Sequence, residues 1–373
     1  MRLSVLALLA LVLLAGTAEA YPQFTLALGT DRCSACHFSP AGGGLINDYG
    51  RDEAGDTLSG RGDGRFAHGA WTPPSWLALG ADVRLAAGAK QLDGQERELL
   101  AFPMQADTYT RIVVSRVSLN LTIGLNGAAR PRADGANPLS YVASRQHYLM
   151  YELPSGNLTV RAGRFFPVFG VRTQDHTAYP RRYMDQGTLE EPYAFEIGGS
   201  AGAWEGYLAG FIGNPIPFTG AGAKANGATA YVERRFEKVI VAGQGRVALT
   251  GDDRRVALGA VGKYWLEGPK LLAMAELDVQ RQSFPGGGDP RLQLLGFAQL
   301  TRMIMPGYMI GAAVQRWSPD LTLGGSSRNA LQLDVQAFPW AHVEAHLLTR
   351  LEATGGDTFD PNLLVLLQLH YYL

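Results

Sequence analysis

Hydrophobic and polar residues alternate along much of the chain from about residue 76 onward. Leu119, Leu121 and Ile123, for example, are separated by Asn120 and Thr122. A period of two predicts β-strands with one apolar and one polar face, because a helix would repeat about every 3.6 residues. The pattern predicts about sixteen strands. They are expected near residues 76–87, 100–109, 113–126, 146–152, 158–165, 194–200, 204–212, 228–236, 239–250, 255–265, 270–282, 291–303, 308–317, 328–338, 343–352 and 362–373.

The predicted connections alternate between long loops and tight turns. Tight turns such as 154–157 and 237–238 fall between loops that are several times longer. The long loops are expected at 127–145, 166–193, 213–227, 283–290, 318–327 and 353–361. An even number of antiparallel strands with long loops at one end and short turns at the other is typical of an outer-membrane β-barrel. The turn at 251–253 is shorter than this pattern predicts.

The N-terminus has the features of an export signal. Arg2 precedes an apolar run at 3–15, and Ala18-Glu19-Ala20 supplies the small residues that a signal peptidase requires. We expect residues 1–20 to be a signal peptide. No later apolar stretch has the length of a spanning helix, so a structure that crosses a membrane would have to be a closed barrel. The predicted fold class is therefore all-β, with a porin-like barrel over residues 75–373 in the bacterial outer membrane.

The charge of the chain is low and balanced. Charged residues make up 18% of the sequence and the formal net charge is −1. A nucleic-acid-binding surface normally carries a clear excess of Lys and Arg. We therefore expect no nucleic-acid partner, and electrostatics does not identify any other.

Both cysteines of the chain lie in one pentapeptide, which begins at Cys33, continues to Cys36 and ends at His37. The spacing Cys-x-x-Cys-His is that of c-type haem attachment, in which two thiols bind the vinyl groups and the histidine ligates iron. A redox dithiol or disulfide and a zinc site are the alternatives. A structural zinc site requires four Cys or His ligands, and the next histidine is His68. The motif therefore predicts one covalent haem c.

Residues 21–74 are predicted to be a monohaem c-type cytochrome segment. A stretch of this length buries little apolar surface of its own, so we expect it to pack against or plug the barrel. It contains no Met, and the sixth iron ligand is expected to be His176, with His68 as the alternative. His176 belongs to the long loop 166–193, a position at which porins commonly fold a loop into the lumen.

Two arginines of the same loop are candidate partners of the haem propionates. Arg181 and Arg182 are adjacent, and a guanidinium binds a carboxylate through two parallel hydrogen bonds. The alternative is that His176 and these arginines lie in a solvated extracellular loop.

The order of features along the chain resembles that of the fused monohaem cytochrome–porins of the bacterial outer membrane. The resemblance rests on the export signal, the motif from Cys33 to His37, the segment Gly42-Gly43-Gly44-Leu45-Ile46-Asn47-Asp48-Tyr49-Gly50 and the strands that follow. It implies a haem in or under the barrel lumen that relays electrons between an extracellular donor or acceptor and a periplasmic c-type cytochrome or other carrier. Some members of that family oxidise ferrous iron, so the resemblance also implies a candidate Fe(II)-oxidising activity.

The sequence leaves three functions open. The first is an outer-membrane electron-transfer protein, surrounded by outer-membrane lipid, for which a trimer is one assembly because many porins trimerise. The second is a diffusion porin with a structural haem. The third is a soluble exported β-protein with a redox Cys-x-x-Cys, since the strands of a soluble sandwich also alternate.

Overall fold

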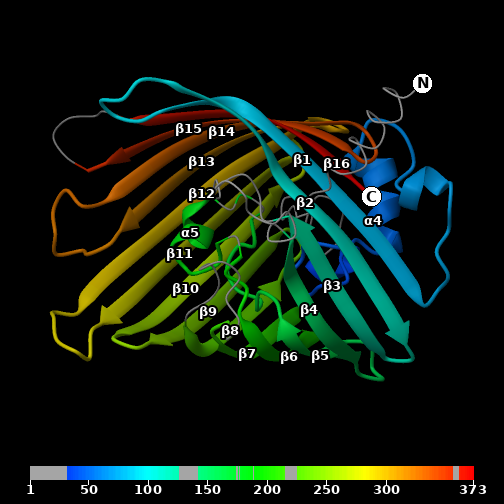
Figure 1. The fold of residues 1–373 in the computed structure, drawn as a ribbon, viewed down its shortest axis with the longest axis horizontal. Helices are drawn as coiled ribbons and strands as arrows, with labels where there is room; N and C mark the ends of the chain where they lie inside the picture. Colours follow the sequence, from blue (N-terminus) through cyan, green and yellow to red (C-terminus); the bar gives the residue numbers. More distant parts are fainter. Residues whose placement is uncertain are drawn as a thin grey trace, which may run out of the picture.

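The computed structural model describes residues 32–125, 142–173, 175, 177–187, 189–214, 225–355 and 361–373. Sixteen antiparallel strands close into a barrel (Figure 1). The strands are β1 (Leu77–Gln91), β2 (Glu98–Val114), β3 (Val117–Leu125), β4 (Val142–Glu152), β5 (Leu158–Arg164), β6 (Tyr193–Ala201), β7 (Trp204–Ile212), β8 (Asn226–Arg235), β9 (Val239–Thr250), β10 (Asp253–Leu266), β11 (Leu271–Ser283), β12 (Arg291–Met305), β13 (Tyr308–Ser318), β14 (Arg328–Trp340), β15 (Val343–Thr354) and β16 (Asn362–Tyr372). The predicted fold class is confirmed. The predicted signal peptide lies outside the described residues.

Each strand pairs with its neighbours in sequence, and β1 pairs with β16 to close the sheet. The closing register runs from Asp82 opposite Tyr372 to Gln91 opposite Leu363. Closure leaves no strand edge with unpaired N–H and C=O groups, which is the condition for a sheet to stand in lipid. Among the described residues, no helix is both long enough and apolar enough to cross a membrane.

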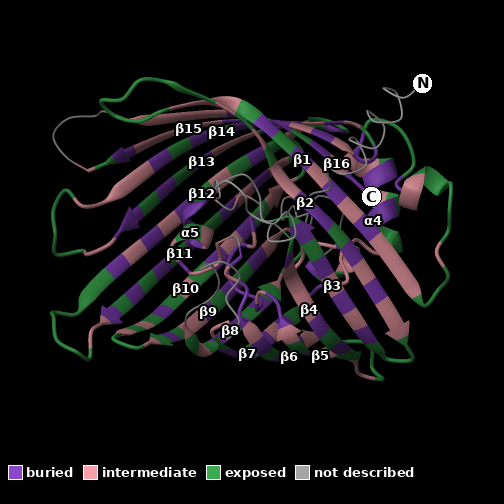
Figure 2. Ribbon diagram, viewed as in Figure 1, coloured by how far each residue is buried: buried purple, intermediate pink, exposed green. Residues whose placement is uncertain are grey.

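Buried and exposed residues alternate along the strands (Figure 2). On β11, Glu276 and Asp278 are buried inside the barrel, whereas Leu277 between them is 55% exposed. On β14, Leu333 is 53% exposed and its neighbours Gln332 and Asp334 are buried. The apolar side chains therefore face outward and the polar side chains face the lumen, which is the arrangement of a barrel surrounded by lipid.

The two ends of the barrel differ in the length of their connections. At one end lie the long loops that include 165–192 and 319–327, and at the other lie short turns such as 202–203, 306–307 and 341–342. The predicted asymmetry is confirmed, and the connection at 251–252 is the short exception at the long-loop end. Because β1 starts and β16 ends at the short-turn end, the N-terminal segment enters the barrel there.

This segment, residues 32–74, is called the plug below. It contains the short helices α3 (Cys33–Cys36) and α4 (Asp48–Glu53), followed by η1 (Ala54–Leu58) and η2 (Phe66–Gly69). In Figure 1 the plug is drawn in blue and lies at the end of the barrel that holds the C-terminus. Its helix α4 is labelled near the C-terminus.

Hydrogen bonds tie the plug to the short turns and to the strand end beside one of them. The Gly60 N–H donates to the Phe338 carbonyl at 2.9 Å, and the Ala341 N–H donates to the Arg61 carbonyl at 2.7 Å. On the opposite wall, the Arg32 guanidinium donates to the Gly202 carbonyl at 2.7 Å. The plug is therefore held at several points around the short-turn mouth.

A charge on the outer face is predicted to destabilise the barrel in lipid. Leu333→Arg places a guanidinium against the hydrocarbon core, which costs about 2–4 kcal/mol near the bilayer midplane. Urea unfolding of the chain in lipid vesicles, followed by heat-modifiable gel mobility, measures the loss. Leu323→Arg is the matched control, because Leu323 is 58% exposed but lies in the loop 319–327. Equal effects of the two variants would contradict a lipid-facing β14.

Candidate functional site

The two cysteines and the histidine of the motif lie on and directly after a single helical turn. The His37 N–H donates to the Cys33 carbonyl at 2.9 Å, which closes α3. The thiols of Cys33 and Cys36 are both free, so the motif does not form a disulfide here. Cys33 is 2% exposed. Residues three apart on a helical turn project from the same side, as attachment to one macrocycle requires.

The glycine run after the motif brings a second segment against it. Gly42, Gly43 and Gly44 all have positive φ, between 62° and 76°, a conformation that other residues avoid. They reverse the chain so that Ile46 forms a β-bridge with His37. The Asn47 side chain then donates to the Ala35 carbonyl at 2.8 Å and fastens the start of α4 to α3.

Close packing of α4 on α3 requires another glycine. A Cβ at Gly50 would lie 2.3 Å from the Cys36 carbonyl oxygen. Any larger residue would therefore push α4 away from the haem motif. This close approach gives a physical reason for Gly50 in the segment that follows the motif.

His37 has the protonation state that an iron ligand needs. Its Nδ1 atom is buried without a hydrogen-bond partner. Burial lowers the pKa of His37 to about 4, although hydrogen bonding with the Gly44 and Gly43 backbone acts to raise it. The imidazole is thus neutral at pH 7 and has a lone pair to donate.

The donor set of the plug fits a c-type haem. Two free thiols on one turn and a neutral imidazole with an unsatisfied ring nitrogen are the groups that covalent attachment and axial ligation use. Burial raises the pKa of the Cys36 thiol to about 11, so this thiol is protonated at neutral pH. Within the described ranges, no group of three His, Cys, Asp or Glu side chains is arranged to hold a metal ion by itself.

The loop between β5 and β6, residues 165–192, crosses the lumen as the sequence predicted. Three of its backbone N–H groups donate to inward-facing side chains of the wall: Gly170 to Gln244, Val171 to Glu276 and Tyr179 to Gln315, each at 2.7 Å. A fourth N–H, of Val168, donates to Glu196 at 2.8 Å. Strands on several sides of the barrel therefore hold the loop across the bore.

The loop and the plug meet inside the barrel at Arg172. Its Nη1 donates to the Pro40 carbonyl of the plug, and its Nη2 pairs with Glu233 of β8, both at 3.2 Å. The guanidinium carbon also lies 5.1 Å from the centre of the Tyr231 ring. Burial by itself lowers the pKa of Arg172, but Cys33 and the acidic groups of the wall raise it well above its ordinary value. Arg172 thus places a guanidinium, paired with Glu233, beside the plug segment that follows the haem motif.

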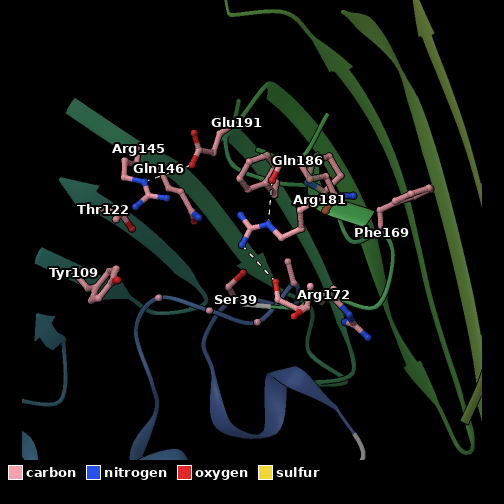
Figure 3. A pocket seen from close by; sticks show the side chains of 17 residues that line it. Ser39, Tyr109, Thr122, Arg145, Gln146, Phe169, Arg172, Arg181, Gln186 and Glu191 are labelled. Carbon is pink, nitrogen blue, oxygen red and sulfur yellow. Dashed lines mark hydrogen bonds and ion pairs between the residues drawn. The ribbon is translucent and has the colours of Figure 1, made fainter. Parts of the chain in front are cut away.

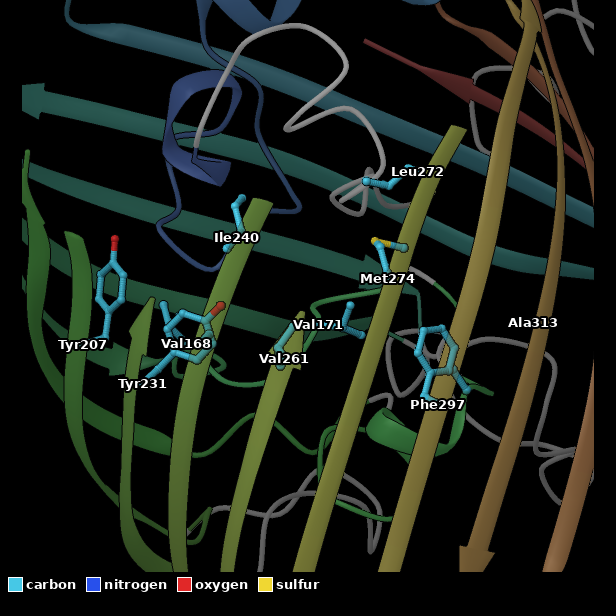
Figure 4. Packing of buried hydrophobic residues seen from close by; sticks show 12 residues of the cluster. Val168, Val171, Tyr207, Tyr231, Ile240, Val261, Leu272, Met274, Phe297 and Ala313 are labelled. Carbon is cyan, nitrogen blue, oxygen red and sulfur yellow. The ribbon is translucent and has the colours of Figure 1, made fainter. Parts of the chain in front are cut away.

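Apolar packing supports the same junction. Val168 and Val171 of the loop pack with residues of the barrel wall, among them Tyr207, Tyr231 and Phe297 (Figure 4). Ala41 of the plug packs against this cluster. The lumen at this level is therefore filled by side chains from the plug, the loop and the wall.

A small cavity remains between the plug and the loop (Figure 3). It has a volume of about 90 Å³ and is lined by Arg145, Arg172 and Arg181, together with the glycines at 42–44. Glu191 also lines it. The cavity is therefore rich in guanidinium groups.

Arg181 and Arg182, the two candidate propionate partners, lie in different places. Arg181 lines the cavity and donates to the Gln186 carbonyl at 3.0 Å and to the Thr173 carbonyl at 3.4 Å. Arg182 does not line it and instead forms an ion pair with Glu352 of β15 at 3.6 Å. The structure thus brings only Arg181 of this pair to the cavity that the plug borders.

The structure describes one of the two candidate sixth ligands. His176 lies outside the described residues. His68 is exposed in η2, where its Nε2 lies 2.8 Å from the Tyr371 hydroxyl and its ring lies 4.5 Å from that of His342. To ligate iron through Nε2, His68 would have to exchange this hydrogen bond for the metal.

The fold is similar to that of several solved bacterial proteins, one of them a porin. The outer-membrane protein OmpT of Vibrio cholerae aligns over 81% of this chain and 99% of its own, with a TM-score of 0.60 and 11% identity. OprB of Pseudomonas putida covers 80% and 94%, with a TM-score of 0.58 and 10% identity. An anion-selective porin from Comamonas acidovorans covers 80% and 99%, with a TM-score of 0.57 and 7% identity.

A trimer form of OmpT is also among these similar structures, with a TM-score of 0.55 and 11% identity. No protein-family model and no curated protein matches the sequence. At these identities the likeness establishes the fold, a sixteen-stranded porin-type barrel.

Loss of one wall acceptor is predicted to loosen the loop. Gln315→Ala removes the acceptor of the Tyr179 N–H, and a buried N–H without a partner costs about 1–3 kcal/mol. Amide hydrogen exchange at Tyr179 should accelerate by about tenfold or more. Gln293→Ala is the matched control, because Gln293 accepts a hydrogen bond from Gln280 and donates one to Gln282, and both partners belong to the wall. Unchanged exchange in Gln315→Ala would show that the loop does not depend on this contact.

Proposed function

We propose that this chain is an outer-membrane electron-transfer protein with one covalent haem c in its plug. Cys33 and Cys36 would form the thioethers and His37 would be the proximal iron ligand. The observation that carries the proposal is the position of the motif. It lies on a helical turn that buries Cys33, within a segment that hydrogen-bonds to the short-turn mouth of a membrane barrel.

The haem, when bound, supplies reversible one-electron chemistry at its iron. The residues of the chain would bind and orient the group. The two thiols fix the orientation of the macrocycle, and the neutral His37 imidazole provides a ligand at pH 7. Arg172 would place a guanidinium, paired with Glu233, beside the plug segment that follows the motif.

The geometry also supports a direction across the membrane. In outer-membrane barrels the short turns face the periplasm and the long loops face the exterior. The plug therefore lies on the periplasmic side, where a soluble c-type cytochrome or other carrier would exchange electrons with it. On the outer side, the donor or acceptor would approach from the long-loop end of the barrel. The resemblance to cytochrome–porins favours ferrous iron as that donor.

The sixth ligand is part of the same proposal. His176 remains the candidate, since it belongs to the loop that meets the plug. His68 remains the alternative. Arg181, and not Arg182, is favoured as a propionate partner because it lines the cavity bordered by the plug. Arg172 joins it as a second candidate that the sequence did not single out.

A diffusion porin is the second candidate function. The similarity to porins favours it, and the polar inner wall is compatible with it. Against open diffusion, the plug is tied to the short turns and the loop is tied across the bore. Both candidates share the barrel and differ in whether the haem is redox-active and whether the lumen conducts.

The double variant Cys33→Ala/Cys36→Ala separates these functions. The mature wild-type chain, purified from outer membranes of cells that mature c-type cytochromes, should stain for covalent haem and show a reversible one-electron couple in a potentiometric titration. The double variant should be colourless but should retain heat-modifiable barrel mobility. Both should conduct ions poorly in planar bilayers, because the plug remains.

Two results would count against the proposal. A wild-type chain without a reversible couple would exclude electron transfer. Porin-like conductance of the wild-type chain, unchanged in the double variant, would favour the diffusion porin.

A further inference from the structure

A cavity of about 480 Å³ lies between the plug and the base of β1 and β2. Its plug lining includes Phe38, Arg51, Phe66 and Trp71. Arg111 of β2 lines it from the barrel wall. Cavities of a few hundred Å³ are the usual size for small-molecule sites. The cavity is five times larger than the one between plug and loop, and neither motif cysteine lines it.

Arg51 brings an unsatisfied buried donor to this cavity. The residue is 8% exposed, and its Nη2 donates to the Leu79 carbonyl at 2.7 Å. Its Nη1 is buried without a hydrogen-bond partner. A buried guanidinium N–H needs an acceptor, and a carboxylate or phosphate oxygen is the acceptor that Arg binds most strongly.

Arg111 supplies a second cation from the wall. It is 5% exposed, and its two terminal nitrogens donate to Glu152 at 2.6 Å and to Asn120 at 3.3 Å. Its Nε is buried and has no partner. Asp48 and Asp52 also line the cavity, but both are exposed. The buried charges of the cavity are thus positive, and the acidic side chains lie where water screens them.

Aromatic rings form the apolar part of the lining. The Phe66 and Trp71 rings pack edge to face, with centroids 5.9 Å apart. Arg51 lies 5.4 Å from the centre of the Phe66 ring, and Arg111 lies 4.5 Å from that of Phe38. Rings next to guanidinium groups suit a ligand that has a flat apolar body and an anionic group.

Helix α4 separates this cavity from the haem motif. Its residues Asp48, Arg51 and Asp52 line the cavity, whereas Gly50 faces the Cys36 backbone. The cavity and α3 therefore lie against different faces of α4. A ligand in the cavity would not compete with the haem for the motif.

We propose that this cavity is a second binding site, for a small aromatic anion such as an aromatic carboxylate or phosphate ester. Arg51 binds the anionic group with its free Nη1, and Phe66 and Trp71 contact the ring. The site opens at the short-turn mouth, so the ligand comes from the periplasmic side. Because Arg111 of β2 also lines the cavity, a ligand that fills it contacts both the plug and the wall, and its binding also strengthens the attachment of the plug to the barrel.

Calorimetric titration of the full-length mature, haem-loaded chain in lipid nanodiscs tests the site, with phenyl phosphate as the probe. Phenyl phosphate is expected to bind, and inorganic phosphate and benzyl alcohol are each expected to bind at least tenfold more weakly. Arg51→Gln should weaken phenyl phosphate binding by at least tenfold. Arg51→Lys should recover part of the affinity, because it restores the charge and a donor.

Two further variants keep the test independent of folding. Phe66→Leu should weaken phenyl phosphate binding and leave the response to inorganic phosphate unchanged. Arg61→Gln is the matched control, since Arg61 is an exposed plug arginine that does not line the cavity, and it should bind like the wild type. Haem staining of every sample checks the haem motif separately.

Three outcomes would overturn the proposal. They are no binding of phenyl phosphate to the wild type, equal binding of inorganic phosphate, or unchanged affinity in Arg51→Gln. A haem-free wild type that still binds the probe would reject the proposed electron-transfer function and leave this site intact.

Discussion

The pairing of every strand edge inside the sheet is the constraint on which the rest of the structure depends. In lipid, an unpaired backbone N–H or C=O has no water to bind, so the sheet must close. The β1–β16 register achieves this closure. Closure with alternating side chains then fixes two surfaces, an apolar one toward lipid and a polar one toward the lumen. The polar surface provides the acceptors that hold the loop and the plug inside.

The lumen is filled from both ends, and the two fillings depend on one another. The loop 165–192 binds wall side chains through its own N–H groups, so its path follows the positions of Gln244, Glu276 and Gln315. The plug binds the short turns through backbone groups of its own. Arg172 connects the two, because it contacts both the plug and the wall. A redox group in the plug would therefore be shielded by both.

The sequence predicted the features that depend on local patterns. Alternation at Leu119 and its neighbours predicted the strands, which the structure confirms. The spacing from Cys33 to His37 predicts a covalent haem, and this stays a prediction. Strand ends were predicted less well: β2 runs from Glu98 to Val114, beyond the expected 100–109. Pairing with β1 extends this strand, as in the Lys90–Glu98 register, and pairing partners are not visible in a single chain's periodicity.

Contacts between distant segments were the other features that the sequence did not predict. Arg172 lies 132 residues from Pro40 and 61 from Glu233, so no local sequence pattern could predict these contacts. Arg181 and Arg182 were both candidate propionate partners, and the structure separates them: Arg182 pairs with Glu352, because adjacent residues on the short helix α5 (Tyr179–Arg182) point in different directions. The cavity beside Arg51 likewise arises only when the plug docks on β1 and β2.

Electron transfer across a sealed bilayer tests the central claim most directly. Wild-type chain is reconstituted into lipid vesicles that enclose oxidised horse-heart-type cytochrome c, and ferrous citrate is added outside. The account predicts that the trapped cytochrome is reduced, one electron for each ferrous ion oxidised, and that vesicles with Cys33→Ala/Cys36→Ala show no reduction above the protein-free rate. Equal reduction rates in the two kinds of vesicle, or none in either, would contradict it.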